Sequence, residues 1–287
     1  MAKSQCYLCG GSSFGRRPGR VRDNQFLEIL ECQQCGLVQL STIEHIGEGH
    51  YEKSGMHGGC PLDPIAWRQR AERDDARRHQ MLVRKVEGRS LLDFGCGPGG
   101  FLEMIASSAK SISGIEVEEA LHEYLGSRGI KVFRQCADAI EKSGAWDIIT
   151  AFHVLEHMKD PRDSLVQLGK LLKKGGELIV EVPNSNDALL TLYQCKEFQE
   201  FSYWSQHLYL FNEQTLETLV GQSGLKLQAV THIQRYPVAN HMHWLAKGKP
   251  GGERVWDFLD DEKLNFLYEK KLAEVGLTDT ILALITR

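Results

Sequence analysis

The residues best suited to chemistry in this 287-residue chain lie in the run SLLDFGCGPGGF, at residues 90–101. Its glycines are spaced Gly95-x-Gly97-x-x-Gly100, between an apolar segment typical of a strand and the start of a helical pattern. Glycines at such a junction let backbone N–H groups approach a ligand closely. The same spacing satisfies the dinucleotide fingerprint, so the glycines alone do not identify the ligand.

Asp93, two residues before the first of these glycines, separates the candidate cofactors. Its carboxylate would repel a pyrophosphate, but it would attract a ligand that carries ammonium and sulfonium groups. We therefore expect S-adenosylmethionine (SAM) to bind at this turn, and NAD is the weaker alternative.

A second group of residues with recognisable chemistry consists of four cysteines near the N-terminus: Cys6, Cys9, Cys32 and Cys35. They form two C-x-x-C pairs, each followed by a glycine, and four thiolates in this pattern can surround Zn²⁺ tetrahedrally. A redox dithiol is the alternative, but that motif normally occurs once. We expect a closed, structural zinc site in a small zinc-ribbon-like module. The other four cysteines are scattered, which indicates a reducing compartment.

The loop between the two cysteine pairs carries four arginines: Arg16, Arg17, Arg20 and Arg22. They either form a solvated charge run or meet a phosphorylated substrate. The formal net charge of the chain is -4, so no global basic field favours a nucleic acid or an anionic membrane as partner. No apolar run approaches the ~18 residues that span a bilayer, and the N-terminus lacks a signal-peptide pattern. We expect a cytoplasmic protein.

The elements that must position these residues follow an alternating pattern of apolar strands and helices, which predicts an α/β fold with a parallel sheet covered on both faces. The expected strands are residues 90–94, 111–116, 130–134, 146–152, 177–182, 225–233 and 280–285. The expected helices are residues 65–86, 161–172 and 212–224, and a further helix of period near 3.6 lies inside a long excursion at about 234–276.

This pattern divides the chain into a zinc-binding module (1–45), a linker or lid with a helix (46–88), and a catalytic domain (89–287) in which the excursion at about 234–276 is a substrate lid. The helix at 65–86 pairs arginines with acids at i,i+3 and i,i+4, which is typical of a solvated helix face. In the linker, Tyr51 either lines the main site or fastens the linker to the core.

Several polar residues follow directly after predicted strands, where ligands bind in open α/β sheets. Glu116 ends the second strand and can accept hydrogen bonds from both hydroxyls of a ribose. Asp138 follows the third strand and either accepts from an adenine amino group or caps a helix. Phe152 and His153 end the fourth strand and should face the same crevice.

In these features the chain resembles the class I SAM-dependent methyltransferases over about residues 65–287. The matching pieces are the DFGCGPG run, Glu116, Asp138, the segment His153–His157, the KKGG run at 173–176 and the terminal strand. The resemblance implies a Rossmann-like seven-stranded sheet whose last strand is antiparallel beside the fifth. The implied cofactor contacts are Asp93, Phe94, Gly95, Gly97, Gly99, Glu116, Val117, Ala137, Asp138, Phe152 and His153, with Tyr51 added from the linker.

The cysteine module joined to such a domain resembles the sugar methyltransferases of antibiotic and polysaccharide pathways. Their C-methylating members carry a Tyr-x-Glu-His tetrad whose glutamate helps abstract a carbon-bound proton. The corresponding stretch here is Trp204-Ser205-Gln206-His207, and glutamine cannot act as a base. We therefore expect O-methylation of a sugar or a sugar-containing acceptor, a small molecule or glycan, rather than C-methylation.

Transfer to a hydroxyl benefits from a general base with a pKa near 7, so histidine is the natural candidate. The candidates are His157, His207 and His241, although each can instead have only a structural role. Two other functions stay open: a zinc-finger RNA methyltransferase, which the net charge of -4 disfavours, and a SAM-binding module without chemistry. The sequence leaves the oligomeric state open.

Overall fold

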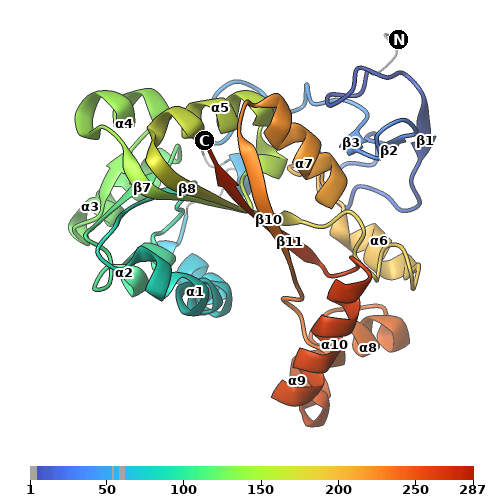
Figure 1. Ribbon diagram of the computed structural model, residues 1–287. Coiled ribbons are helices and arrows are strands. Elements are labelled where there is room, and N and C mark those ends of the chain that lie inside the picture. Colours follow the sequence, from blue (N-terminus) through green and yellow to red (C-terminus); the bar gives the residue numbers. More distant parts are fainter. Residues whose placement is uncertain (1–4, 54, 58–61) are drawn as a thin grey trace.

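The structure is a computed structural model that describes residues 5–53, 55–57 and 62–287. A seven-stranded sheet forms its centre, and a smaller four-stranded sheet lies beyond one end of it (Figure 1). In spatial order, the large sheet contains β10 (Lys226–Ile233), β11 (Thr280–Thr286), β8 (Leu172–Pro183), β7 (Trp146–Phe152), β4 (Ser90–Phe94), β5 (Ser111–Ile115) and β6 (Lys131–Phe133).

The strands from β8 to β6 are parallel to one another, whereas β11 pairs antiparallel with both β8 and β10. The predicted Rossmann-like sheet, with its last strand antiparallel beside the fifth, is therefore confirmed. The start of β8 differs from the prediction, because the strand begins at Leu172 and not at residue 177. Its register with β7 shifts between Trp146 and Ile148, so the KKGG run at 173–176 lies at an irregularity within the strand and not before it.

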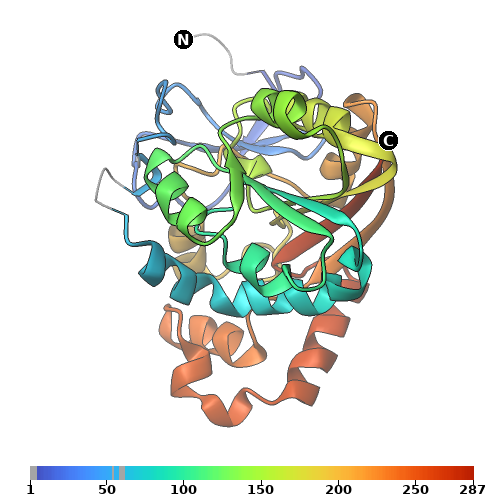
Figure 2. The same ribbon diagram turned by 90° about the vertical axis from the view of Figure 1, so that its left-hand side faces the viewer.

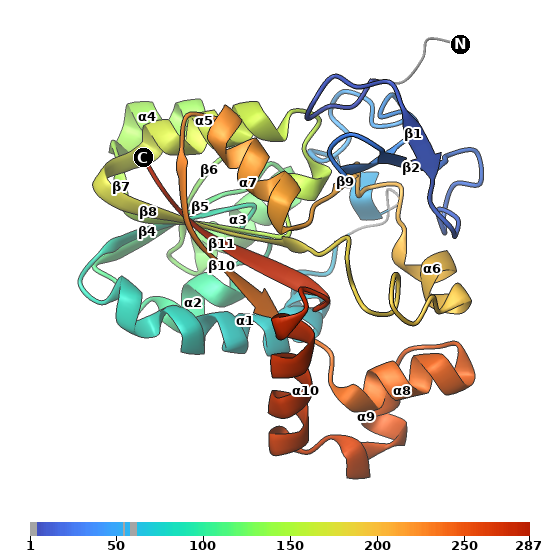
Figure 3. The same cartoon turned by 45° about the vertical axis from the view of Figure 1, so that its right-hand side comes forward.

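Helices cover both faces of the large sheet (Figure 3). One face carries α4 (Cys136–Ser143), α5 (Pro161–Leu171) and α7 (Glu213–Gln222), and the other carries α1 (Pro64–Val86), α2 (Gly100–Ile105) and α3 (His122–Ser127). Successive strand residues alternate between the two layers, since Leu91 packs with the α1 side and Leu92 with the α5 side. Such strands are buried on both faces, which explains their continuous apolar runs.

Capping side chains define where several helices begin. Asp63 accepts hydrogen bonds from the first turn of α1, and Asp160 does so for α5 before the proline at 161. Asn212 forms a capping box with Thr215 at the start of α7. These caps place the helix starts within a residue of their predicted positions.

The small sheet contains β1 (Phe14–Arg16), β2 (Ile29–Cys32), β3 (Val38–Leu40) and β9 (Tyr209–Leu210). Its fourth strand therefore comes from the catalytic part of the chain, which sequence periodicity did not reveal because β9 has only two residues. Leu37 and Val38 are fully buried in the same core cluster as Leu208. The N-terminal module and the large domain thus share one hydrophobic core.

The excursion between β10 and β11 is a helical lobe that projects beyond α1 (Figure 2). It contains α8 (Val238–Lys247), α9 (Gly252–Val255), the 3₁₀ turn η4 (Asp257–Leu259) and α10 (Glu262–Glu274). The helix expected inside the excursion is present as α10, but further helical elements precede it, so the excursion is not one helix. Asp261 caps a new helix at α10, and Leu264 and Leu267 are exposed on it.

The remaining elements are short: the 3₁₀ turns η1 (Gly55–His57), η2 (Glu119–Leu121) and η3 (Leu155–His157), and the helix α6 (Lys196–Ser202). Among the described residues, no helix has both the length and the apolar character that crossing a membrane requires.

Candidate functional site

A cavity of 410 Å³ opens at the carboxyl ends of β4, β5 and β7. Of the predicted cofactor contacts, it is lined by Tyr51, Asp93, Gly95, Gly97, Glu116, Val117, Phe152 and His153. Four others do not line it: Phe94, Gly99, Ala137 and Asp138. Most of the residues predicted to contact the cofactor therefore lie around one cavity. Among the described residues, none from the loop after β6 lines it.

The glycine turn closes against its surroundings at three points where the backbone adopts positive φ. A side chain at Gly95 would clash with Val154 at 2.5 Å, and one at Gly97 would press on Trp67 at 3.3 Å. Gly99 has φ 75° and faces buried leucine and isoleucine side chains. Gly95 and Gly97 therefore keep the backbone close to the cavity, whereas Gly99 serves the start of α2.

Glu116 is held rigidly at the end of β5. One carboxylate oxygen accepts the N–H of Gly97 at 2.8 Å, and the other accepts the N–H of Glu118 at 2.9 Å. Burial raises the pKa of this carboxyl, and the backbone hydrogen bonds oppose that effect. Each oxygen retains a lone pair, so Glu116 can accept hydrogen bonds from a ligand's hydroxyl groups.

Asp93 is 4% exposed and accepts a hydrogen bond of 2.7 Å from the hydroxyl of Thr150. Burial raises the pKa of the Asp93 carboxyl to about 7, although that hydrogen bond opposes the effect. Near pH 7, a carboxyl group with this pKa is present in both its neutral and its ionised form, and a charge placed beside it shifts the balance between the two. A cationic ligand in the cavity would therefore favour its ionised form.

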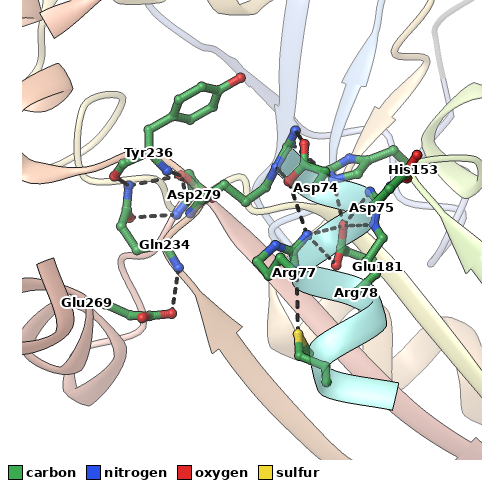
Figure 4. A network of polar contacts seen from close by, with 12 residues as sticks. Asp74, Asp75, Arg77, Arg78, His153, Glu181, Gln234, Tyr236, Glu269 and Asp279 are labelled. Carbon is green, nitrogen blue, oxygen red and sulfur yellow. Dashed lines mark hydrogen bonds and ion pairs between the residues drawn. The ribbon is translucent and has the colours of Figure 1, made fainter. Parts of the chain in front are cut away.

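Behind the cavity, a network of charges joins α1 to the sheet and to the lobe (Figure 4). Fully buried Glu181 accepts hydrogen bonds from Arg77 at 2.9 Å and Arg78 at 2.7 Å. Asp74 pairs with Arg235, which is in the segment that leads from β10 into the lobe. Burial alone would raise the pKa of Glu181, but His153 and the two arginines hold it well below its usual range.

This network corrects the prediction that the arginine-rich helix presents a solvated face. Its arginines at 77 and 78 point inward because Glu181, inside an apolar strand, requires compensation. The charge at 181 within the run ELIVEVP is the one sequence signal that could have revealed the pairing.

A cluster of histidines and one carboxylate occupies the turn after β7. His153 has an unusual φ of 54°, and its Nδ1 lies 3.1 Å from Oε1 of Glu156. Glu156 is fully buried, and its Oε2 has no hydrogen-bond partner among the described residues. His157 donates from Nδ1 to the carbonyl oxygen of Gln206 at 2.9 Å, and its ring centroid lies 4.9 Å from that of His207.

The imidazoles of His157 and His207 are neutral near pH 7. Burial lowers the pKa of His157, and burial together with the neighbouring His157 lowers the pKa of His207 to about 3. A neutral imidazole offers a lone pair to a proton or a cation, but a pKa this low makes His207 a weak general base by itself.

The structure does not bring His241 to this cluster. It is 2% exposed in α8, with Nδ1 2.8 Å from the hydroxyl of Tyr268 and Nε2 3.0 Å from Nε2 of Gln234. Of the described residues in the lobe and the segments that flank it, Arg235 alone lines the cavity. Tyr51 lines the cavity and also donates a hydrogen bond to the backbone of His157 at 3.2 Å, so both interpretations of Tyr51 hold.

The arginine loop does not form an open basic patch. Arg16 pairs with Glu28, and Arg20 pairs with Glu200. Arg17 is 9% exposed, and Arg22 lies over the rings of Phe201 and Trp204. Arg22 therefore fastens the loop to the segment around α6, whereas Arg16 and Arg20 are largely exposed, as the solvated alternative predicts.

The four N-terminal cysteines come together in the structure. The sulfurs of Cys6 and Cys35 lie 3.5 Å apart, as do those of Cys9 and Cys32, and all four lie within 4.8 Å of one another. Four sulfurs around one tetrahedral Zn²⁺ at about 2.3 Å would be ~3.8 Å apart. The donor set and its spacing therefore fit a zinc ion.

Solved structures share this fold. A chain from the complex between the Haloferax volcanii Trm112 methyltransferase activator and a methyltransferase is 13% identical, with a TM-score of 0.52 over 79% of this chain and 98% of that chain. A SAM-dependent methyltransferase from Archaeoglobus fulgidus is 18% identical, with a TM-score of 0.50 over 78% of this chain and 93% of that chain.

Curated relatives match by sequence. A ubiquinone biosynthesis O-methyltransferase from Coxiella burnetii is 26% identical over 54% of this chain and 71% of its own length. A tRNA U34 carboxymethyltransferase from Haemophilus influenzae is 31% identical over 47% of this chain, and the match spans only 42% of that relative's length. The model of the methyltransferase domain family matches residues 66–230, more than half of the chain. The chain therefore belongs to the methyltransferase domain family and is a SAM-dependent methyltransferase.

Proposed function

We propose that the protein transfers the methyl group of SAM to a hydroxyl group of a small-molecule acceptor, and that the acceptor is a sugar or contains one. The observation that carries the proposal is the position of His157, which lines the same cavity as the glycine turn and adjoins His207. Methyl transfer is an in-line displacement at the sulfonium carbon, so positioning the nucleophile supplies most of the rate enhancement.

In this proposal, SAM occupies the part of the cavity between the glycine turn and β5. Glu116 accepts hydrogen bonds from the ribose hydroxyls, and Asp93 faces the cationic methionine portion. Phe152 and His153 lie on the β7 side. Asp138 and Ala137, in the first turn of α4, would contact adenine at the mouth of the cavity.

Oxygen is favoured over carbon as the methyl acceptor because the stretch before β9 offers no free carboxylate base. Gln206 is 7% exposed, and its Oε1 accepts a hydrogen bond of 2.8 Å from Nε2 of His50. Two features favour a small molecule over RNA: the net charge of -4, and the arginine loop, in which Arg16 and Arg20 pair with glutamates and Arg22 stacks on aromatic rings. The O-methyltransferase relative acts in ubiquinone biosynthesis and the other on tRNA, so both classes belong in a test.

The N-terminal module is proposed to hold a structural zinc ion at Cys6, Cys9, Cys32 and Cys35 and to position the stretch that carries His207. Asp23 accepts hydrogen bonds from the backbone and hydroxyl of Ser205 at 2.9 and 2.7 Å. Leu208 donates to the backbone of Glu156 at 2.8 Å and accepts from Leu40 at 3.1 Å. We keep the division into residues 1–45, 46–88 and 89–287, with 234–276 as a lid, as the proposed organisation.

The direct test is incubation with ¹³C-methyl SAM and panels of hydroxylated small molecules, nucleotide sugars and unmodified tRNA. The proposal expects S-adenosylhomocysteine together with a product whose labelled carbon has the NMR shift of a methoxy group. A carbon-bound methyl, labelled tRNA or SAM binding without turnover on any panel would contradict it.

Replacing Glu116 by alanine is expected to weaken SAM binding by roughly tenfold or more, because hydrogen bonds to a charged group are each worth about 1.5–3 kcal/mol. Titration calorimetry measures the dissociation constant. Glu119→Ala is the matched control, since this exposed glutamate on the following turn pairs with Arg134 at the surface. Equal effects of both substitutions would remove Glu116 from the ribose site.

His207→Ala is expected to leave SAM affinity within twofold and to lower turnover by roughly 10²-fold or more, as expected for loss of a group that assists proton removal. Steady-state kinetics with the acceptor that the panel experiment identifies give the turnover number. If the variant turns over at the wild-type rate, His207 has no part in the reaction.

Purified protein is expected to contain at least one zinc ion per chain, held by the four cysteines, and removing it with a strong chelator should lower the midpoint of thermal unfolding, because the module shares the core. Elemental analysis and circular dichroism report the two quantities. Cys9→Ser should lose the metal, and Cys136→Ser, outside the cluster, should retain it. Full zinc content in Cys9→Ser would contradict the assignment.

A further inference from the structure

We propose that Glu156, His157 and His207 bind a divalent first-row transition-metal cation at the acceptor end of the cavity. One donor atom from each of these residues lies within 4.8 Å of the other two. The site is separate from the four-cysteine cluster. Its existence stands on this geometry, and the role that we give the cation rests on the proposed function.

The donor atoms are free to point at one ion. Oε2 of Glu156 is buried without a hydrogen-bond partner among the described residues, and an orphaned carboxylate oxygen is costly. His157 uses Nδ1 to donate to Gln206, so its Nε2 carries the lone pair. In the part of the chain that the structure describes, neither ring nitrogen of His207 has a hydrogen-bond partner. A cation would satisfy all three groups.

The kind of donor selects the kind of cation. Two imidazole nitrogens and one carboxylate oxygen suit ions such as Zn²⁺, Fe²⁺ or Mn²⁺, whereas Mg²⁺ and Ca²⁺ prefer oxygen donors. Metal–donor bonds of about 2.0–2.2 Å require neighbouring donors to approach to within ~3–3.5 Å. The donor atoms now lie within 4.8 Å of one another, so side-chain rotations that bring them closer would be needed on binding.

The surroundings of the three residues resemble the support that metal ligands receive in proteins. His153 lies 3.1 Å from the other carboxylate oxygen of Glu156, and the carbonyl of Gln206 fixes the ring of His157. The ring of Trp204 packs against the ring of His207 at 5.5 Å. Partners of this kind orient ligands and set the tautomer of the histidine.

The position of the site indicates what the cation does. Among the three residues His157 lines the cavity, together with Tyr51 and Met158, so open coordination positions would face the acceptor. A cation there would lower the pKa of an acceptor hydroxyl and so favour its ionisation. The hydroxyl proton leaves to water, the oxygen forms a bond to the methyl carbon, and the carbon–sulfur bond breaks with its electron pair on sulfur.

The test is Mn²⁺ binding to the full chain, preloaded with one equivalent of Zn²⁺ so that the thiolates are occupied. Electron paramagnetic resonance should show one bound Mn²⁺, and electron spin echo modulation should show coupling to two imidazole nitrogens. Glu156→Gln, which preserves shape, and His207→Asn should each weaken Mn²⁺ binding at least tenfold. His79→Asn, a histidine of α1 that does not line the cavity, is the matched control.

The site is overturned if no Mn²⁺ binds at millimolar concentration, if the spectra lack nitrogen coupling, or if both ligand variants bind as the wild type does. These readouts need no acceptor, so they separate the two proposals. Metal binding without a methoxy product would refute the proposed function and keep the site. Undiminished O-methylation by protein that binds no Mn²⁺ would refute the site and keep the function.

Discussion

Burial of carboxylates at one edge of the sheet is the constraint on which the rest of this structure depends. Asp93, Glu116, Glu156 and Glu181 lie at or near the carboxyl ends of neighbouring strands, each less than a tenth exposed. Glu181 is compensated by two arginines, and Glu116 by two backbone amides. Asp93 and the free oxygen of Glu156 are left for ligands, and we propose a sulfonium cofactor for the first and a metal cation for the second.

The same constraint explains why parts of the chain that are distant in sequence depend on one another. Arg235 leads into the lobe and pairs with Asp74 of α1, which also pairs with Arg77, one of the two arginines that compensate Glu181. The stretch before β9 lies between the turn at Glu156 and the N-terminal strand β3. The module and the lobe therefore act on the site through positioning and contribute few residues to the cavity.

Much of this arrangement was predictable from the sequence, for identifiable reasons. The seven-stranded sheet and its antiparallel last strand followed from the resemblance. Asp93 was found from its charge beside the glycine turn, and Glu116 because polar residues at strand ends face the ligand crevice. Pairwise contacts were not predictable. Helical periodicity does not tell which charged face of a helix is buried, so the orientation of Arg77 and Arg78 in α1 was predicted wrongly. His241 became a catalytic candidate because it lies in the presumed lid, but its side chain is enclosed within the lobe.

The most direct test of this account is a count of the protons exchanged when SAM binds, made by calorimetry at pH 7 in buffers with different ionisation enthalpies. Because the pKa of Asp93 is about 7 with the cavity empty, the positive cofactor should displace about half a proton from it. The Asp93→Asn variant should not release this proton. Subtracting its proton count from that of the wild type removes any contribution from the amino group of SAM itself. Equal proton counts in the wild type and the variant would contradict the claim that a buried, uncompensated Asp93 recognises the cationic cofactor.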